Sequence, residues 1–241
     1  MAEAHTTIAG FLRVRREAAR LTRAELARRA GVSEALIQKI EQGVRQPTAI
    51  ALGALFTALE VEFPYREWAA SALLPELTGL HYGEMEPAEL NFLQTLPHPA
   101  WYQTVPEHDI IAVNDAYRRW FPGAEAGANG LEWMLLDPRA RAVMGDWERE
   151  AHTMVYAFRH MGPGAAASAR GEEIAAVCRQ SPDWERLWSK RLPPEGVPHR
   201  STRVRSPDTG EFIVMNVQLF RCELPRREWL MYTMTPARTA G

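Results

Sequence analysis

The chain has 241 residues, enough for one small and one medium-sized core, since single domains usually hold roughly 100 to 200 residues. Although 46% of the residues are hydrophobic, no run reaches the roughly 18 uncharged apolar residues that a membrane-spanning helix needs. The N-terminus lacks the basic-then-apolar order of a signal peptide, so we expect a cytoplasmic protein. Cys178 and Cys222 have no paired spacing and predict neither a disulfide framework nor a zinc site.

The net charge of −2 hides an uneven distribution of charge along the chain. Between Ile8 and Pro47 there are nine basic and four acidic residues, a local balance of +5. Between Arg66 and Arg118 there is neither lysine nor arginine, whereas acidic residues are frequent. The first segment would attract phosphate groups and the second would repel them. Because a basic segment is often only a solvated face, a nucleic-acid site needs support from a motif.

The N-terminal segment shows the spacing of apolar residues that is typical of helices. This spacing predicts a first helix from Ile8 to about Arg20. A second helix is expected after Thr22, because Glu25 three residues later completes a capping box. The buried side of that helix is expected to hold Leu26 and Ala30.

A short turn then separates the second helix from a third. Gly31 ends the second helix, and Ser33 is placed to cap a third helix that runs to Glu41 before Gly43 ends it. A fourth helix is predicted from Thr48, and its expected buried residues are Ile50, Leu52, Leu55, Phe56 and Leu59. A helix, a short glycine turn and a capped helix allow one helix to brace on a DNA backbone while the next enters the major groove.

Residues 21–43, LTRAELARRAGVSEALIQKIEQG, carry a more specific pattern. This run resembles the XRE and lambda-repressor family of helix-turn-helix regulators, and the resemblance covers about sixty residues. The residues in register with the family pattern are Ala27, Gly31, Ser33, Ile37, Ile40, Glu41 and Gly43.

The resemblance implies a set of DNA contacts on and beside the third helix. The base-reading positions correspond to Glu34, Ala35 and Lys39. A glutamate can accept from a cytosine amine, an alanine can contact a thymine methyl, and a lysine can donate to guanine. For Glu34 the alternative is that its charge only rejects wrong sequences. Phosphate contacts, which set register rather than sequence, complete the set; the further members of the expected DNA-binding set are Arg23, Ser33, Arg45 and Gln46.

Arg16 and Glu41 occupy the places of a pair that this family forms between its first and third helices, so the resemblance implies a structural role for both. Breaking one partner is expected to cost several kcal/mol if the pair is buried. Modules of this family bind DNA weakly alone, and a homodimer on two half-sites about one helical turn apart is therefore the expected binding unit. Double-stranded operator DNA is the expected partner, and neither a membrane, a metal nor a cofactor is predicted.

The predicted boundary between two domains lies in residues 79–87, where glycine and proline accumulate. Residues 65–80 read as one or two further helices. We expect a helix-turn-helix DNA-binding domain over residues 1–80 and a second domain over residues 81–241. The core of the second domain is expected to begin with Leu90, Phe92, Leu93 and Leu96.

The second domain mixes helical and alternating patterns. Two short strands are expected on either side of the turn at 106–109, with a helix at 116–121 that Asn114 and Asp115 can cap. Residues 130–160 are expected to be helical with a break at 137–138, and 162–169 to form a loop. Helices around Ile174 and after Ser181 precede strands at 202–206, 211–220 and 229–235. This pattern predicts an α+β domain.

Several short runs in this domain lie in a recognisable order: Val113-Asn-Asp-Ala, Leu136-Asp-Pro-Arg-Ala-Arg, Asp146-Trp-Glu, Ser181-Pro-Asp-Trp-Glu-Arg-Leu-Trp, Ser206-Pro-Asp-Thr-Gly-Glu and Tyr232-Thr. Together they resemble the MmyB-like ligand-binding domain, over roughly residues 90–237. The resemblance implies a PAS-like sensor fold and an apolar tunnel for a small, fatty-acid-like ligand. The expected fold is thus an all-α helix-turn-helix bundle followed by an α+β PAS-like sensor domain.

Candidate ligand-binding residues are those that can form aromatic or flexible apolar walls with a few polar anchors; they are Tyr102, Asn114, Trp133, Met154, Phe158, Met215 and Tyr232. Arg139 is a candidate to hold a carboxylate head group. For the aromatic residues and methionines the alternative is plain core packing. For Arg139 it is a surface or helix-capping role.

Other classes of function receive less support from the sequence. There is no glycine-rich phosphate loop and no nucleophile elbow, and the seven histidines are scattered without metal spacing, so we do not expect an enzyme. A domain used only for dimerisation or for holding a protein partner remains an alternative, and an antitoxin is disfavoured by the length of the second domain. The favoured hypothesis is a regulator in which ligand binding shifts the arrangement of two DNA-binding heads, and with it the operator affinity.

Overall fold

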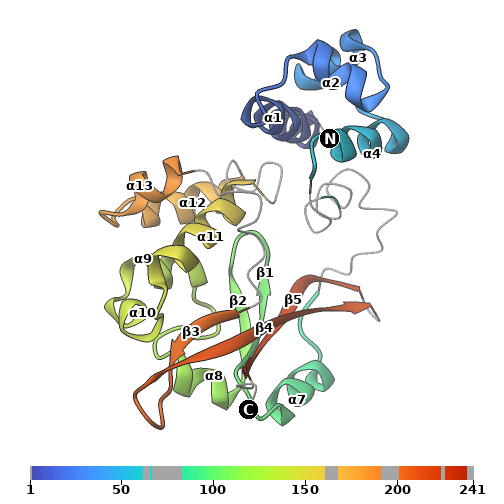
Figure 1. The fold of residues 1–241 in the computed structure, drawn as a ribbon. Coiled ribbons are helices and arrows are strands. Elements are labelled where there is room, and N and C mark those ends of the chain that lie inside the picture. Colours follow the sequence, from blue (N-terminus) through green and yellow to red (C-terminus); the bar gives the residue numbers. More distant parts are fainter. Residues whose placement is uncertain are drawn as a thin grey trace. The chain divides into compact units, whose positions relative to one another are not determined.

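The computed structural model describes residues 2–61, 66, 83–160, 168–190, 201–223 and 226–237. Two compact units share the chain: one contains residues 1–79 and 160–168, and the other contains residues 80–159 and 169–241. Among the described residues, the first unit is built from helices and the second combines helices with one sheet (Figure 1). The described part of the chain contains no helix that is both long and apolar enough to span a membrane.

The described helices of the first unit are α1 (Ala2–Ala18), α2 (Arg23–Ala30), α3 (Glu34–Glu41) and α4 (Ala49–Ala58). The four predicted helices are therefore confirmed, although α1 begins at Ala2 and not at Ile8, and side-chain caps explain where α2, α3 and α4 begin. Thr22 Oγ1 accepts a hydrogen bond from the Glu25 amide at 3.2 Å, and the Glu25 carboxylate accepts one from the Thr22 amide at 2.8 Å. Ser33 Oγ accepts from the Leu36 amide at 3.2 Å, which caps α3.

Gly31 makes the tight connection between α2 and α3. Its φ of 64° lies in the left-handed region that favours glycine, and the Val32 amide donates back to the Ala27 carbonyl at 3.1 Å. The two helices then pack with α1 and α4 around one core. Its fully buried large side chains are Ile8, Leu12, Leu26, Ile37, Ile40 and Leu55.

Ile50 was expected in this core, and that prediction is wrong because Ile50 is 87% exposed. An α-helix advances about 100° per residue, so Ile50 lies roughly opposite Leu52, whose side chain is buried. The apolar pattern of α4 is wider than the side that the core covers. Ala30, expected on the buried side of α2, is half-buried, whereas Ala27 and Leu26 are buried.

The second unit contains a five-stranded antiparallel sheet in the order β2-β1-β5-β4-β3. The strands are β1 (Ala100–Thr104), β2 (Ile110–Val113), β3 (Ser201–Arg205), β4 (Phe212–Glu223) and β5 (Arg226–Pro236). All the strands predicted from alternation are confirmed, with bounds shifted by a few residues. Only the structure shows that β1, from the start of the domain, lies between β2 and the final strand β5.

The helices of the second unit are α7 (Pro87–Thr95), α8 (Asp115–Trp120), α9 (Gly130–Leu136), α10 (Pro138–Val143), α11 (Trp147–His160), α12 (Ala169–Cys178) and α13 (Trp184–Ser189). In Figure 1, α9 to α13 gather on one side of the sheet and α7 lies apart from them. The break predicted at Asp137 is confirmed, because Asp137 ends α9 and caps α10.

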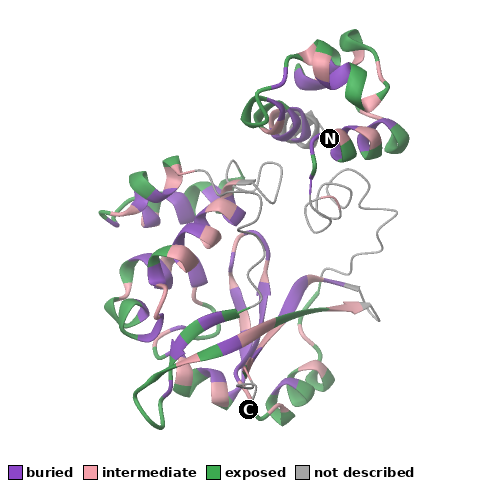
Figure 2. Ribbon diagram, viewed as in Figure 1, coloured by how far each residue is buried: buried purple, intermediate pink, exposed green. Residues whose placement is uncertain are grey.

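The sheet buries both of its faces around β1 (Figure 2). On one face Tyr102 packs with Leu93 of α7 and with Trp229 and Met231 of β5. Trp101, which points to the other face because side chains alternate along a strand, stacks on Tyr232 with ring centroids 5.1 Å apart.

Helix α7 packs against the sheet along only a narrow strip of its surface. Leu93 is fully buried, but Leu90 and Phe92 are 42% and 51% exposed, so their predicted place in the core is wrong. An ion pair strengthens this narrow contact: the fully buried Arg227 of β5 donates to both carboxylate oxygens of Glu89 at 3.0 and 2.8 Å. The helices predicted at 65–80 and most of the loop predicted at 162–169 lie outside the described residues.

Candidate functional site

Helix α3 has one buried and one exposed side. Ile37 and Ile40 are each 2% exposed and fix the helix on the core. The three candidate base-reading residues all lie on the exposed side; they are Glu34, Ala35 and Lys39. The side chains of all three residues are therefore open to solvent.

The remaining candidate DNA contacts flank this surface. Ser33 is exposed and its hydroxyl caps α3, while Arg45 and Gln46 are exposed in the segment that follows α3. Arg23 begins α2 and is half-buried. The structure therefore places the whole predicted set at the two ends and the exposed side of the α2–turn–α3 segment.

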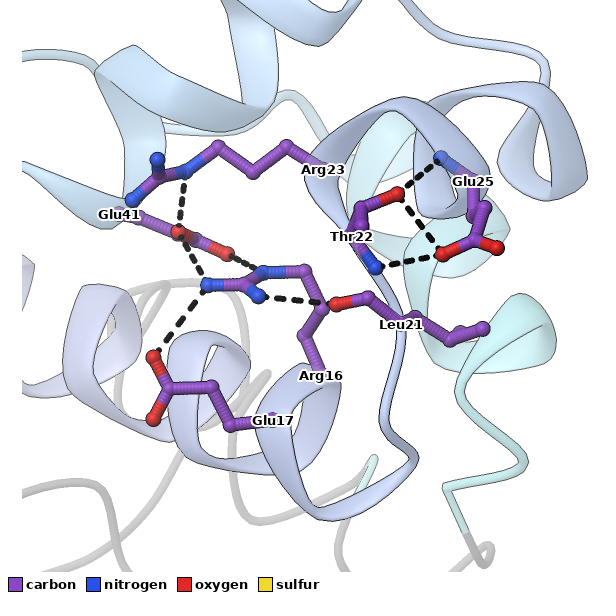
Figure 3. Close-up of polar contacts among 7 residues, drawn as sticks. All are labelled: Arg16, Glu17, Leu21, Thr22, Arg23, Glu25 and Glu41. Carbon is purple, nitrogen blue, oxygen red and sulfur yellow. Dashed lines mark hydrogen bonds and ion pairs between the residues drawn. The ribbon is translucent and has the colours of Figure 1, made fainter.

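A three-residue ion network connects α1, α2 and α3 (Figure 3). Arg16 donates from Nε to Glu41 Oε1 at 2.6 Å and from Nη2 to Glu41 Oε2 at 3.0 Å. Arg23 Nε donates to the same Oε2 at 2.7 Å. Arg16 Nη1 also donates to the Leu21 carbonyl at 2.9 Å, which fixes the connection between α1 and α2.

Glu41 serves both arginines of this network, while Glu17 Oε1 lies 3.4 Å from Arg16 Nη2 as a second, exposed carboxylate. Glu41 has a side chain only 1% exposed, yet it carries a single negative charge against two guanidinium groups. Burial alone would raise the pKa of Glu41, but hydrogen bonds from Arg16 and Arg23 lower it below its ordinary value, so the carboxylate is ionised. The side chain of Arg23 is 39% exposed, so part of it reaches the surface beside α3.

The second unit has an aromatic core on the helical side of its sheet. Trp101 lies 4.9 Å from the ring of Tyr117 on α8, and Tyr117 lies 4.9 Å from Phe121. Phe121 in turn meets Trp133 of α9 edge-on at 6.2 Å. Counting from Tyr232 on β5, five aromatic rings thus connect the sheet to the helices that cover it.

Two family profiles match this chain. The profile described as the MmyB-like transcription regulator ligand binding domain matches residues 85–241. The chain belongs to the MmyB-like transcription regulators. A helix-turn-helix domain profile matches residues 7–67 of the same regulator. A search of curated proteins found no match.

These matches define what the regulator does in outline. A helix-turn-helix domain binds DNA, and the larger domain is a ligand-binding domain, so the chain is a DNA-binding transcription regulator with a site for a small ligand. Neither matched family is a family of enzymes. Within the described ranges, no three His, Cys, Asp or Glu side chains gather where they would hold a metal ion, and both cysteines are free.

The structure separates the candidate ligand-binding residues into two groups. Tyr102 points to the α7 side of the sheet. Tyr232, and Met215 by the register of β4 against β5, share the opposite face. The structure therefore does not bring Tyr102 together with Tyr232, and a site on one face can use only one of them.

The candidates on helices lie on the same side as Tyr232. Trp133 joins the aromatic core through Phe121 and donates from Nε1 to the Pro122 carbonyl at 3.2 Å. Phe158 is fully buried, with its ring 6.4 Å from Trp188. Met154 is half-buried on α11, and a Cβ atom on Gly130 would meet its Cε at 3.6 Å.

The two polar candidates are engaged within the protein. Asn114 caps α8 by accepting from the Tyr117 amide at 2.8 Å, and its amide group donates to the carbonyls of Leu96 and His98 at 3.0 and 2.8 Å. Arg139 is exposed and its guanidinium binds the Asp137 carboxylate, with Nη2 to Oδ2 at 2.6 Å. Both side chains thus have structural partners, as the alternative reading of Arg139 expects.

Sequence reasoning missed a buried polar row beside the aromatic core. Trp101 Nε1 donates to Gln103 Oε1 at 2.7 Å, and Gln103 Nε2 lies 3.1 Å from His108 Nδ1. The side chains of these three residues are buried. The available signal was Gln103, a polar residue at an inward position of a strand that begins with Ala100, Trp101 and Tyr102.

Proposed function

We propose that this regulator binds operator DNA as a homodimer, with α3 of each protomer in the major groove. The exposed side of α3, held by two buried isoleucines and flanked by basic residues, supports this proposal. In it, Glu34, Ala35 and Lys39 face the base edges, while Arg23, Ser33, Arg45 and Gln46 lie at the backbone. The observation that carries it most strongly is Arg23, whose guanidinium is anchored by Glu41 beside this surface.

The C-terminal part, which we place at residues 81–241, is proposed to change operator affinity when it binds a small apolar ligand. The matched ligand-binding family supports a ligand, and the class implied by the resemblance is fatty-acid-like. The antiparallel five-stranded sheet with α9 to α13 gathered on one side supports a PAS-like sensor. We place the ligand site on the face of the sheet that carries Trp101 and Tyr232, because the candidate ligand-binding residues of α9 and α11 lie on that side.

DNA binding is tested with an operator selected from a random duplex library and measured by fluorescence anisotropy. Lys39→Ala and Arg23→Ala are each expected to weaken binding about tenfold or more. Arg119→Ala is the matched control, since it removes an exposed arginine from α8 in the second unit. Full affinity in both N-terminal variants, with unchanged folding, contradicts the proposed surface.

The ligand is tested by mass spectrometry of the organic extract of gently purified protein, followed by titration of the compound found against operator binding. A stoichiometric small molecule that changes operator affinity supports a ligand-responsive regulator. An empty extract and no binding in a panel of fatty acids contradict the fatty-acid-like ligand.

A second role for the C-terminal domain, dimerisation or binding of a protein partner, is favoured by one observation. Phe212, Val214 and Phe220 share one face of β4 by alternation and are 39%, 45% and 50% exposed. If this strip is the dimer contact, Phe220→Ser should shift the protein to a monomer in light-scattering measurements. A dimer of unchanged stability would assign dimerisation to another surface.

A further inference from the structure

Helix α4 differs from the other described helices of the first unit because it carries no charge. Residues 47–59, which contain the whole helix, include no acidic or basic side chain. Helices α1, α2 and α3 each contain both acidic and basic residues. A helix at the surface of a soluble protein normally has charged and polar residues on its outer side, whereas a helix that is apolar all round is normally buried all round. The composition of α4 therefore predicts that a partner covers its outer side.

The fold of one protomer covers only one side of this helix (Figure 2). The ring of Phe56 meets that of Phe11 on α1 edge-on, with centroids 6.4 Å apart. On the outer side, Ile50 is 87% exposed, which makes it the most exposed large hydrophobic side chain in the described part of the chain. The buried residues of α4 are Ala51, Leu52, Leu55 and Phe56.

Small residues surround Ile50 on the outer side. Gly53 and Ala54 follow it by three and four residues, so they lie beside it on the helix surface. Ala49 and Gly53 are exposed and Ala54 is half-buried. An added Cβ on Gly53 would meet nothing within 4 Å. These four residues, which we call the α4 patch, combine one projecting apolar side chain with a flat floor of small residues.

The charges of the first unit lie around the α4 patch and not within it. At the C-terminal end of the helix, Arg66 Nη1 lies 3.4 Å from Thr57 Oγ1, and Arg66 Nε donates to the Val61 carbonyl at 2.6 Å. Before the helix, residues 8–47 carry a local charge of +5. Two copies of this unit therefore repel each other over much of their surface, and a second copy meets less repulsion at the uncharged patch.

A second copy of the chain fits the α4 patch better than DNA does. A DNA backbone is bound mainly by positive groups and by hydrogen-bond donors, and the side chains of the patch provide neither. Across a two-fold axis the same patch supplies both halves of a contact. The projecting Ile50 of one copy can then lie over the small Gly53 of the other.

The α4 patch is too small to hold a dimer together by itself. Stable interfaces bury about 800 Å² on each partner, from roughly 20 to 30 residues, whereas the patch has one large side chain among its four residues. A contact of this size is effective between copies that DNA already holds close together, because their effective concentration is high. Since α4 begins at Ala49 and α3 ends at Glu41, the patch is close in sequence to the surface proposed to enter the major groove.

We propose that the α4 patches of two protomers contact each other across the two-fold axis of the operator-bound dimer, with Ile50 of each protomer packed over Gly53 of the other. The contact couples binding at the two half-sites and fixes the spacing between them. This inference rests on the proposed function, because it needs two DNA-bound heads, and it names the surface through which those heads meet.

The experiment measures binding of the full chain to three duplexes by fluorescence anisotropy. One duplex has a single half-site, one has two half-sites at the selected spacing, and one has ten further base pairs between them. The added helical turn keeps both heads on one face of the DNA but separates the patches. The native protein is expected to bind the selected spacing about tenfold more tightly than the widened one, as burial of part of two isoleucine side chains predicts.

Ile50→Gln is expected to remove this tenfold advantage and to leave affinity for the single half-site within twofold. Glutamine is a good helix former, so the exposed substitution should not unfold α4. Ile50→Leu should keep the advantage. Val44→Gln is the matched control, because Val44 is 72% exposed but lies outside the α4 patch.

Three results of this experiment overturn the inference. The first is an advantage that persists in Ile50→Gln. The second is an equal loss of affinity for the single half-site, which would place Ile50 on the DNA. The third is the same loss of advantage in Val44→Gln, which would make it a general effect of removing exposed apolar surface.

A measurement on the unaltered protein does not depend on the folding of a variant. In protein labelled with carbon-13 at the isoleucine δ1 methyl groups, the Ile50 resonance is assigned by its absence from Ile50→Val. It is expected to shift when the duplex with two half-sites at the selected spacing is added, and to stay in place with the single half-site. A shift with both duplexes, or with neither, overturns the inference.

Failure of the DNA-binding proposal is distinguished by the single half-site. If Lys39→Ala and Arg23→Ala bind it with full affinity, the α3 surface is wrong and this inference falls with it. If those variants lose affinity whereas Ile50→Gln keeps the spacing advantage, operator binding through α3 stands and only the contact between the heads is overturned.

Discussion

Arg23 and Glu41 are joined by a hydrogen bond of 2.7 Å between Arg23 Nε and Glu41 Oε2, although they belong to α2 and α3 and are 18 residues apart. The same carboxylate binds Arg16 of α1. One buried acid therefore both joins three helices and sets the direction in which Arg23 leaves the core. Stability of the DNA-binding unit and the position of a proposed phosphate contact depend on the same side chain.

Arg16→Met is expected to destabilise the first unit by about 3 kcal/mol, because it leaves Glu41 buried with only Arg23 as partner. Urea unfolding followed by far-ultraviolet circular dichroism measures the change. Glu17→Gln is the control, since Glu17 is 57% exposed and meets Arg16 only at 3.4 Å; it should cost less than about 1 kcal/mol. Equal effects of the two substitutions would show that Glu41 is not strongly buried.

Glu41→Gln is expected to flatten the acid side of the stability profile. Hydrogen bonds from Arg16 and Arg23 outweigh burial and lower the folded pKa of Glu41. Its contribution is therefore fully present above the unfolded pKa near 4.3 and is lost as pH falls through the folded value. Thermal unfolding below about pH 4.3 should show a smaller loss of stability per pH unit in the variant than in the native protein.

Arg23→Ala should reduce the salt dependence of operator binding. Each phosphate contact contributes about 0.9 to the slope of log affinity against log salt, so a dimer that loses two such contacts should lose about 2 from that slope. The affinity should fall for specific and unrelated sequences alike. Lys39→Ala should instead weaken the selected operator more than unrelated DNA. An unchanged slope for Arg23→Ala contradicts the phosphate contact.

His108→Asn should remove a pH dependence of stability in the second unit. Burial lowers the folded pKa of His108 to about 4, below the ordinary value near 6.5. Between these values the unfolded chain binds a proton that the folded chain does not, so stability falls as pH falls, by up to about 1.4 kcal/mol per pH unit. Asparagine is the chosen replacement because His108 has a φ of 65°, in the left-handed region that asparagine tolerates. Denaturant unfolding at several pH values between 6.5 and 4 should give a shallower slope for the variant.

Two glycine substitutions should have opposite signs. A Cβ on Gly145 would lie 2.9 Å from Arg203 Cβ and 3.0 Å from Phe212 Cδ1, so Gly145→Ala should destabilise the sheet by about 1 to 3 kcal/mol. Gly53 lies inside α4 with nothing within 4 Å of an added Cβ. Gly53→Ala should stabilise the first unit by about 1 kcal/mol, because alanine is the better helix former. A midpoint of chemical unfolding that does not fall for Gly145→Ala would contradict the packing described at Gly145, and one that does not rise for Gly53→Ala would contradict the open space at Gly53.

The DNA-binding half was largely predictable from the residues alone, because its signals are local. Thr22 with Glu25, Gly31 and Ser33 each act within a few residues, and they place α2 and α3 correctly. The exposed side of α3 follows from the spacing of Ile37 and Ile40. What this local pattern could not show is that Ile50 would be exposed, since that depends on how far the rest of the core reaches around α4.

In the larger domain, alternation and helical spacing predicted the strands and most helices, but they did not predict which residues contact each other across the fold. Alternation places Trp101 and Tyr102 on opposite faces of β1, but only strand pairing with β5 puts Tyr232 against Trp101. The Gln103 and His108 contact depends in the same way on a turn whose backbone conformation no residue pattern specifies. Local hydrogen bonding and periodicity are written in short stretches of sequence, whereas contacts between distant residues arise only when the whole core packs.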